Sequence, residues 1–211
     1  MPVHVFYDNS NVLWGARYAC MDLEPDVYEF AVRIYFKNIF QLMANDREIV
    51  TKVLAGSVPP SCEPLWAYAQ QNGYTTDLLR KVEREDGTVG EQGVDELLHL
   101  KIANTLLDYP SGTLAIATGD GRVSQFGTGF ITQIDRALNH GWDVEVWTWS
   151  QVCHRRYNEY HNDPNRKFTL HKFDFHYFNI TFLRSGEYYR DLPDGVRQRI
   201  VVPNRTVRPL R

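Results

Sequence analysis

The chain has 211 residues and a formal net charge of -3, and hydrophobic residues make up 43% of it. This length and composition predict one folded domain with a sizeable core and exclude both a disordered chain and an overall basic surface for nucleic acid, although a local basic groove is compatible with the charge. The first residues lack a basic segment followed by an apolar one, and no apolar run is long enough to span a bilayer. We therefore expect an intracellular protein, cytoplasmic or nuclear, that has no membrane partner.

The first predicted element is a buried strand from Val3 to Tyr7, which ends in the polar tetrapeptide DNSN, residues 8–11. These residue types favour turns, because their side chains hydrogen-bond to their own backbone. The carboxyl ends of parallel strands are also where open α/β sheets bind ligands. The tetrapeptide is therefore either a plain turn or part of a site. Apolar residues at near-helical spacing predict the next helix over residues 26–43.

Hydrophobic runs and amphipathic stretches then alternate along the chain. Further strands are predicted over residues 48–57, 74–82, 113–120 and 143–149. Further helices are predicted over residues 61–73, 94–109, 130–141 and 150–160, with an exposed polar loop over residues 83–93. This alternation predicts a three-layer α/β/α, Rossmann-like fold, in which right-handed crossovers place helices on both faces of a parallel sheet.

The pattern weakens after His161, where an aromatic, strand-like stretch over residues 168–183 follows a polar loop. From Arg197 onward the chain carries five arginines and no acidic residue. This end is predicted to be an extended tail over the domain surface or a flexible basic arm, with RNA or a protein as its partner.

Acidic residues fall at one predicted edge of the sheet. Asp8 follows the first strand, Asp95 and Glu96 begin a helix, and Asp120 follows the fourth strand. Clustered carboxylates repel one another, so such a group usually implies a compensating cation. Oxygen ligands without paired cysteines or histidines favour Mg²⁺ or Mn²⁺ over zinc. Each position also has an ordinary explanation, because acids complement a helix dipole and Asp-Gly pairs form turns.

Taken together, these motifs resemble the NYN domain, a branch of the PIN-like ribonuclease superfamily that includes the Regnase-type nucleases. The similarity rests on DNSN after the first strand, GVDELL, ATGDG and GWDVEVWTWS, in this order within residues 3–160. It implies an NYN/PIN-like nuclease domain over residues 1–160 and a C-terminal extension, residues 161–211, that packs on the domain or forms a tail. The implied activity is metal-dependent hydrolysis of RNA, single-stranded rather than paired, by an endoribonuclease rather than an exonuclease.

The resemblance also implies roles for individual residues. Asp8, Asp95 and Asp120 would hold the metal, and Glu96 would support them as a fourth catalytic residue. Asn11 and Ser10 would position the metal shell or the RNA backbone. The candidates for phosphate or base contacts are Arg17, Arg80, Lys81, Arg84, Arg122 and Trp14. For each of these the alternative is an ordinary surface or packing role.

The chain departs from the family pattern at Arg122 and Ser124, where family members often carry an acid, and at Lys101, where many have an acid that faces the site. Such losses would weaken metal binding and leave nucleic-acid binding intact. The alternative function is therefore a catalytically weak or inactive RNA-binding or scaffold module of the same fold. The sequence leaves the oligomeric state open.

Overall fold

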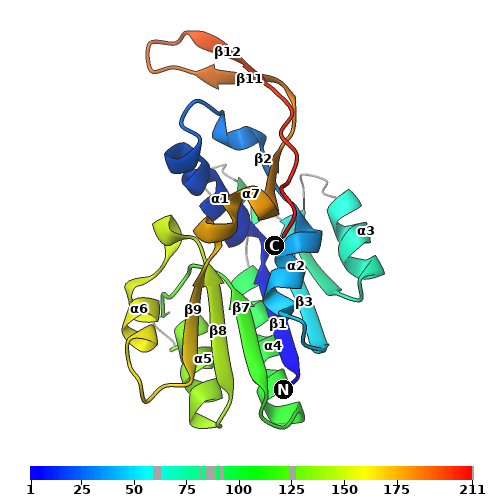
Figure 1. Ribbon diagram of the computed structural model, residues 1–211, viewed down its shortest axis with the longest axis vertical. Coiled ribbons are helices and arrows are strands. Elements are labelled where there is room, and N and C mark those ends of the chain that lie inside the picture. The colour runs from blue at the N-terminus through cyan, green and yellow to red at the C-terminus, as the bar shows by residue number, and fades with distance from the viewer. Residues whose placement is uncertain (59–62, 81, 84–88, 91–92, 124–126, 211) are drawn as a thin grey trace.

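The computed structural model describes residues 1–58, 63–80, 82–83, 89–90, 93–123 and 127–210. Its centre is a sheet of six parallel strands with helices on both faces, as predicted (Figure 1). In spatial order, the strands of this sheet are β4 (Thr75–Arg80), β3 (Ile49–Val58), β1 (Val3–Asp8), β7 (Thr113–Ala117), β8 (Asp143–Thr148) and β9 (Phe168–Lys172). The sheet thus continues beyond residue 160, because β9 is its last strand.

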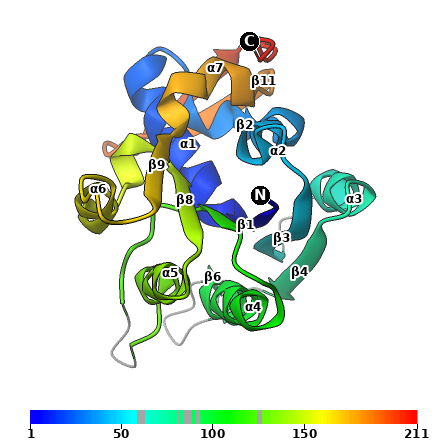
Figure 2. The ribbon, with the colours of Figure 1, turned by 60° about the horizontal axis from the view of Figure 1, so that its bottom comes forward.

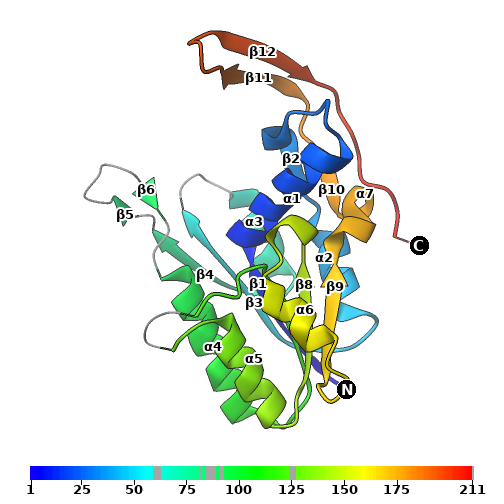
Figure 3. The same ribbon diagram turned by 90° about the vertical axis from the view of Figure 1, so that its left-hand side faces the viewer.

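Helices cover the two faces of the sheet (Figures 2 and 3), and a hydrophobic cluster lies on each face. The helices on the first face are α1 (Asn9–Leu23), α2 (Phe36–Ala44) and α3 (Glu63–Gln71). Those on the second face are α4 (Val94–Asp108), α5 (Phe130–Asn139) and α6 (Arg155–His161). Strand β1 serves both clusters, because Val5 and Tyr7 face the first and Phe6 faces the second. Within the described residues, none of the helices has the length and apolar character needed to cross a membrane.

The structure corrects the sequence prediction just after β1. The DNSN tetrapeptide does not form a turn, because Asp8 is the N-cap of α1 and accepts a hydrogen bond from the Asn11 backbone N–H at 3.0 Å. Residues that favour turns also favour N-caps, for the same reason. The helix predicted over 26–43 is wrong in its first half, where η1 (Glu29–Ala31) and β2 (Val32–Ile34) precede α2.

Two smaller predictions also need correction. The helix predicted over 150–160 is divided into η2 (Ser150–Val152) and α6, because the backbone between them is extended and the His154 N–H donates to the Gly119 carbonyl at 3.1 Å. The loop predicted over 83–93 contains part of a two-stranded ladder, in which β5 (Val82–Glu83) pairs with β6 (Val89–Gly90).

The C-terminal region returns to the first face of the sheet. After β9 come η3 (Phe173–His176), α7 (Tyr177–Ile180) and β10 (Thr181–Leu183), and β10 pairs with β2. A hairpin of β11 (Gly186–Asp191) and β12 (Arg197–Val202) then projects from the end of the molecule that α1 approaches (Figure 1).

The last residues run back over the domain as an extended segment. Arg205 forms an ion pair with Glu24 at 3.0 Å and hydrogen-bonds the Thr181 carbonyl at 2.8 Å. Arg208 stacks on Phe178, at 4.3 Å from the ring centre. The end of the predicted tail thus packs on the domain surface, whereas its beginning, Arg197–Val202, forms a strand of the projecting hairpin. Arg205 and Arg208 contribute to packing.

Candidate active site at the switch point of the sheet

The candidate site lies where the direction of the strand order reverses. Numbered by sequence within the sheet, the strands run 3-2-1-4-5-6, so β1 and β7 are neighbours whose connections lead to opposite sides. Open α/β sheets bind ligands at the carboxyl ends of the strands at such a switch point. Asp8 is the last residue of β1, and Asp120 follows β7 by three residues.

One threonine connects the two acids. The Thr118 hydroxyl donates to Asp8 Oδ2 at 3.1 Å and accepts from the Asp120 backbone N–H at 3.2 Å. Asp8 is 3% exposed and Thr118 is fully buried, so this arrangement is held rigidly by the end of the sheet. The topology therefore brings together the ends of the two strands that carry Asp8 and Asp120, two of the three residues predicted as metal ligands.

Asn11 fixes the loop that carries Asp120. Its side-chain Oδ1 accepts a hydrogen bond from the Gly119 backbone N–H at 2.6 Å, which ties the first turn of α1 to the end of β7. Gly119 lies against the Val152 carbonyl, where any side chain would collide. The glycine that precedes Asp120 is thus required by close packing, and Asn11 acts as a positioning residue for that acid.

Asp120 already has a cationic partner. Arg122 donates from Nε to Oδ1 at 3.0 Å and from a terminal nitrogen to Oδ2 at 2.9 Å, and its side chain is 83% exposed. Burial alone would raise the pKa of Asp120, but the hydrogen bonds from Arg122 outweigh burial, so this pKa lies below its usual value. Arg122, predicted as a phosphate-binding residue, thus pairs with a predicted metal ligand.

The predicted acids of α4 approach the same region from the opposite layer. Asp95 and Glu96 occupy the first turn of α4, after Gly93 in the left-handed conformation (φ 82°). The charge of Asp95 acts on Arg122, and the charges of Glu96 and Asp120 both act on His99. Asp95 is therefore near the pair of Arg122 and Asp120, whereas the exposed Glu96 lies at the margin of the site.

His99 is a site residue that the sequence analysis misses. It lies one turn after Asp95 on α4, is 9% exposed, and packs edge-on against Phe130 at 4.5 Å between ring centres. Neither ring nitrogen has a hydrogen-bond partner within the described residues. Burial lowers the pKa of His99, although Glu96 and Asp120 oppose that shift. The spacing of four residues from Asp95 was the available signal, since it places both on one helix face.

The remaining candidates have different positions. Ser10 lies in the first turn of α1, close to Asp8, whereas Arg17 lies two turns further along this helix, between the rings of Trp14 and Phe30. Arg80 ends β4, a strand away from β1, and its side chain is not described. Three other positions named in the sequence analysis lie outside the described residues: Lys81, Arg84 and Ser124.

The carboxylates at the switch point could supply some, but not all, of the ligands of a hard divalent cation. Among the described residues, no three histidine, cysteine, aspartate or glutamate side chains form a group that could hold a metal. Mg²⁺ is often bound by only one or two carboxylates, with waters and substrate phosphates as the other ligands. Asp8 and Asp120 are a pair of this type. The absence of a third close ligand predicts weak binding without a phosphate-bearing ligand.

A dinucleotide is a poor match for this switch point. Dinucleotide-binding sheets place a pyrophosphate on the free N–H groups at the start of the first helix. Here the carboxylate of Asp8 already occupies that position, accepts from the Asn11 N–H, and would repel a phosphate without a cation between them.

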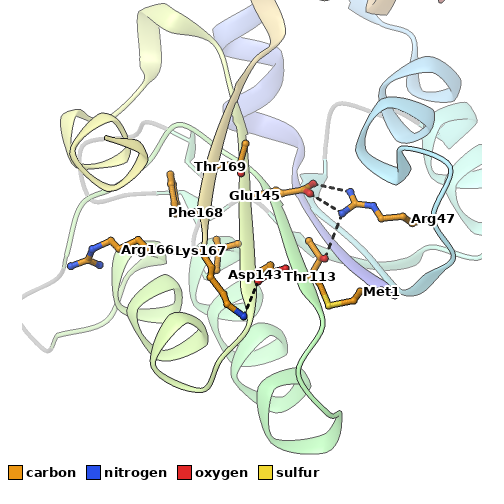
Figure 4. Close-up of a pocket in the computed structure, with 10 residues that line it drawn as sticks. Met1, Arg47, Thr113, Asp143, Glu145, Arg166, Lys167, Phe168 and Thr169 are labelled. Carbon is orange, nitrogen blue, oxygen red and sulfur yellow. Dashed lines mark hydrogen bonds and ion pairs between the residues drawn. The ribbon is translucent and has the colours of Figure 1, made fainter. Parts of the chain in front are cut away.

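A cavity of about 390 Å³ lies at the opposite edge of the sheet, where β7, β8 and β9 begin (Figure 4). The acids of this cavity are paired with cations. Arg47 binds Glu145 through two hydrogen bonds of 2.7 and 2.8 Å, and Lys167 lies 3.5 Å from Asp143. These contacts join the starts of neighbouring strands, so we assign this cavity a structural role.

Comparison of the chain with protein-family models, with curated proteins and with solved structures gave no match. Its function must therefore be inferred from its own residues. The observations that bear on it are the carboxylate pair at the switch point, the guanidinium of Arg122 beside that pair, and the buried imidazole of His99.

Proposed function

We propose that the chain is a metal-dependent ribonuclease with a PIN-like domain of the NYN type. The observation that carries this proposal is the Thr118 hydroxyl, which joins the carboxylate of Asp8 to the backbone of Asp120 at the switch point. A sheet that only needed a turn after β7 would not require a buried carboxylate beside it, because moving a charged group out of water is costly even when it accepts hydrogen bonds. Two acids that one threonine holds at the same point of the sheet are better explained as ligands of a bound cation.

Asp8 and Asp120 would hold Mg²⁺ or Mn²⁺, with Asp95 as a ligand through water. When bound, the metal would lower the pKa of a water molecule and neutralise charge on the phosphate. Thr118 and Asn11 keep the two ligand-bearing segments at a fixed separation through their hydrogen bonds. Once a metal takes the place of Arg122 at the Asp120 carboxylate, the donors of this guanidinium, whose side chain is 83% exposed, would be free to bind a phosphate group of RNA. Glu96 and Ser10 would assist at the margins of the site.

The buried His99 adds a group that can accept or donate a proton near this site. Its ring is neutral at physiological pH because burial lowers its pKa. Because neither nitrogen of this neutral imidazole has a hydrogen-bond partner in the described part of the chain, the ring is available to a water molecule or to the leaving oxygen of a substrate. We therefore propose His99 as a candidate group for proton transfer at the margin of the site.

The proposal is tested by incubating the full chain with end-labelled single-stranded RNA in Mn²⁺, Mg²⁺ or EDTA. We expect internal cleavage with either metal and none in EDTA. Asp120→Asn should lose the activity while its far-ultraviolet circular dichroism is unchanged. Cleavage that persists in EDTA would refute a metal-dependent reaction, and cleavage that persists in Asp120→Asn would refute Asp120 as a metal ligand.

A second candidate function is favoured by one observation. Arg122 forms a two-point contact with Asp120, so a cation of the protein itself already neutralises this acid. If Arg122 keeps Asp120 from binding a metal, the domain would bind RNA without cleaving it. Tight RNA binding without cleavage in Mn²⁺, together with no measurable Mn²⁺ binding, would favour this second function.

A further inference from the structure

Beside the candidate site, aromatic rings form a continuous line across the surface. Trp14 lies 6.4 Å from Tyr18 and 5.9 Å from Phe30, measured between ring centres. Tyr28 lies 5.4 Å from Phe30 and 5.4 Å from Tyr188 on the hairpin. We call these five residues the aromatic line. It leads from α1 through η1 to the β11–β12 hairpin, with α1 and β2 placed between the sheet and the hairpin (Figure 3).

Three members of the aromatic line are exposed to solvent. Trp14 is 47% exposed, Tyr18 46% and Phe30 37%. Large apolar side chains that are exposed singly need no explanation, but adjacent ones indicate an interaction surface. The other four tryptophans of the chain are at most 5% exposed, so Trp14 is the exception.

Guanidinium groups lie between these rings. Arg17 is 4.6 Å from the centres of both Trp14 and Phe30, and its buried Nε has no hydrogen-bond partner among the described residues. The charges that act on Arg17 are those of Arg33 and Glu29, and Glu29 is already paired with Arg190 at 2.7 Å. The carboxylate nearest to Arg17 is thus already neutralised by another guanidinium, which leaves the charge of Arg17 available to an anionic ligand.

The aromatic line is continuous with the candidate active site. Asp8 caps α1, and Ser10, Trp14 and Tyr18 follow at spacings of four residues, which places them on one face of that helix. At 1.5 Å per residue, Tyr18 is about 15 Å along the helix from Asp8. An RNA strand with one phosphate at Asp8 and Asp120 can therefore continue along this face of α1 to the aromatic line.

We propose that the aromatic line binds single-stranded RNA, with bases on Trp14 and Phe30 and backbone phosphate at Arg17 and Arg33. This inference rests on the proposed function and names the surface on which the RNA substrate lies outside the candidate active site. Aromatic faces interleaved with cations suit unpaired bases, because every base has a π-face and every nucleotide a negative charge. Arg17 provides the positive charge that a neutral apolar protein partner would not use. A guanidinium held between two exposed ring faces, with its Nε unpartnered among the described residues, matches the alternation of base and phosphate along single-stranded RNA.

The exposed Trp14 provides a direct probe of this surface. Tryptophan fluorescence of the full chain in EDTA should fall in a saturable way when unlabelled uridine-rich RNA is added, since bases that stack on an indole quench it. Trp14→Phe keeps an aromatic ring but should lose the RNA-dependent change in fluorescence. Anisotropy of a labelled RNA shows independently when the protein is saturated. Tryptophan emission that is unchanged at this saturation would refute the assignment.

Affinity measurements test the energetic contribution of the surface. Trp14→Ala should weaken binding about tenfold, within the range expected for a lost base-stacking contact. Arg17→Gln should lower the slope of log affinity against log salt by about 0.7, as expected for one lost phosphate contact on a single strand. Phe175→Ala is the matched control, because Phe175 is 84% exposed but lies in η3, away from the aromatic line, and it should bind RNA like the wild type.

The same variants separate this inference from the proposed function. RNA binding that depends on Trp14, without cleavage in Mn²⁺, would support the RNA surface and reject the ribonuclease. Cleavage that proceeds equally in Trp14→Ala, with unchanged affinity, would reject the RNA surface and leave the ribonuclease. A wild-type dimer that Trp14→Ala converts to a monomer, with no RNA bound by either, would overturn the inference in favour of self-association.

Discussion

The contact between Arg122 and Asp120 predicts that removing the arginine will tighten metal binding. In the wild type, a cation that uses the Asp120 carboxylate must first displace the two-point contact with the guanidinium, at 2.9 and 3.0 Å. Arg122→Ala removes this competition and also removes a positive charge beside the site. We therefore expect the variant to bind Mn²⁺ more tightly than the wild type.

The exposure of Arg122 sets the magnitude. Its side chain is 83% exposed and that of Asp120 is 15% exposed, so solvent screens most of the attraction. Exposed ion pairs contribute about 0.5 to 1 kcal/mol. This free energy corresponds to an Mn²⁺ dissociation constant that is about two- to fivefold lower in Arg122→Ala.

Isothermal titration of the full chain with Mn²⁺ measures this difference. Arg155→Ala is the matched control, because Arg155 is 89% exposed and pairs with Glu159 on α6 instead of with a site residue. The control should bind Mn²⁺ like the wild type. Equal or weaker binding in Arg122→Ala would refute the assignment of Asp120 as a ligand that Arg122 competes for.

Three further predictions follow from the contacts of individual residues. Asp8→Ala should lower the free energy of unfolding by about 2 kcal/mol in urea, because it removes an N-cap and a buried acceptor, whereas Asp8→Asn should change it by less than about 0.5 kcal/mol. Burial lowers the pKa of His99 below 6.5, so the free energy of unfolding contributed by its neutral ring is fully present above that pH and is lost as pH falls through the folded pKa. The free energy of unfolding of His99→Leu, measured in urea, should therefore fall less than that of the wild type between about pH 7 and pH 5. Arg197 and Arg199 are 69% and 60% exposed on the hairpin, so their double replacement by Gln should leave the melting temperature unchanged but flatten the salt dependence of RNA binding; an unchanged slope would exclude the hairpin from the RNA path.

The parallel sheet could be predicted because its strands are buried on both faces. Thr113–Ala117 and Val3–Asp8 are continuous runs that are buried throughout, and such runs are distinct in a sequence. Helix α1 could not be predicted, because its buried residues include the small Gly15, Ala16 and Ala19 and give a weak apolar pattern. The first half of the helix predicted over 26–43 failed for a tertiary reason, since β2 pairs with β10 from a distant part of the chain.

The site was predictable to the extent that it follows from strand order. Acids after β1 and β7 must meet if these strands are neighbours, and they are. The contacts of Arg122 and the burial of His99 depend on how side chains pack, which sequence spacing does not determine. On α4, for example, the apolar Leu107 is 81% exposed, whereas the polar His99 is buried.

The central claim is that Asp8 holds a catalytic metal at the switch point, and Asp8→Asn tests it most directly. Asn keeps the N-cap of α1 but loses the charge that a cation requires. The measurement is the rate of cleavage of labelled single-stranded RNA in Mn²⁺ by the wild type and by Asp8→Asn, with both proteins confirmed as folded by thermal melts. We predict that the variant cleaves RNA at least about a hundredfold more slowly than the wild type and that Mn²⁺ no longer raises its melting temperature. Equal cleavage by the two folded proteins would contradict a catalytic role for Asp8.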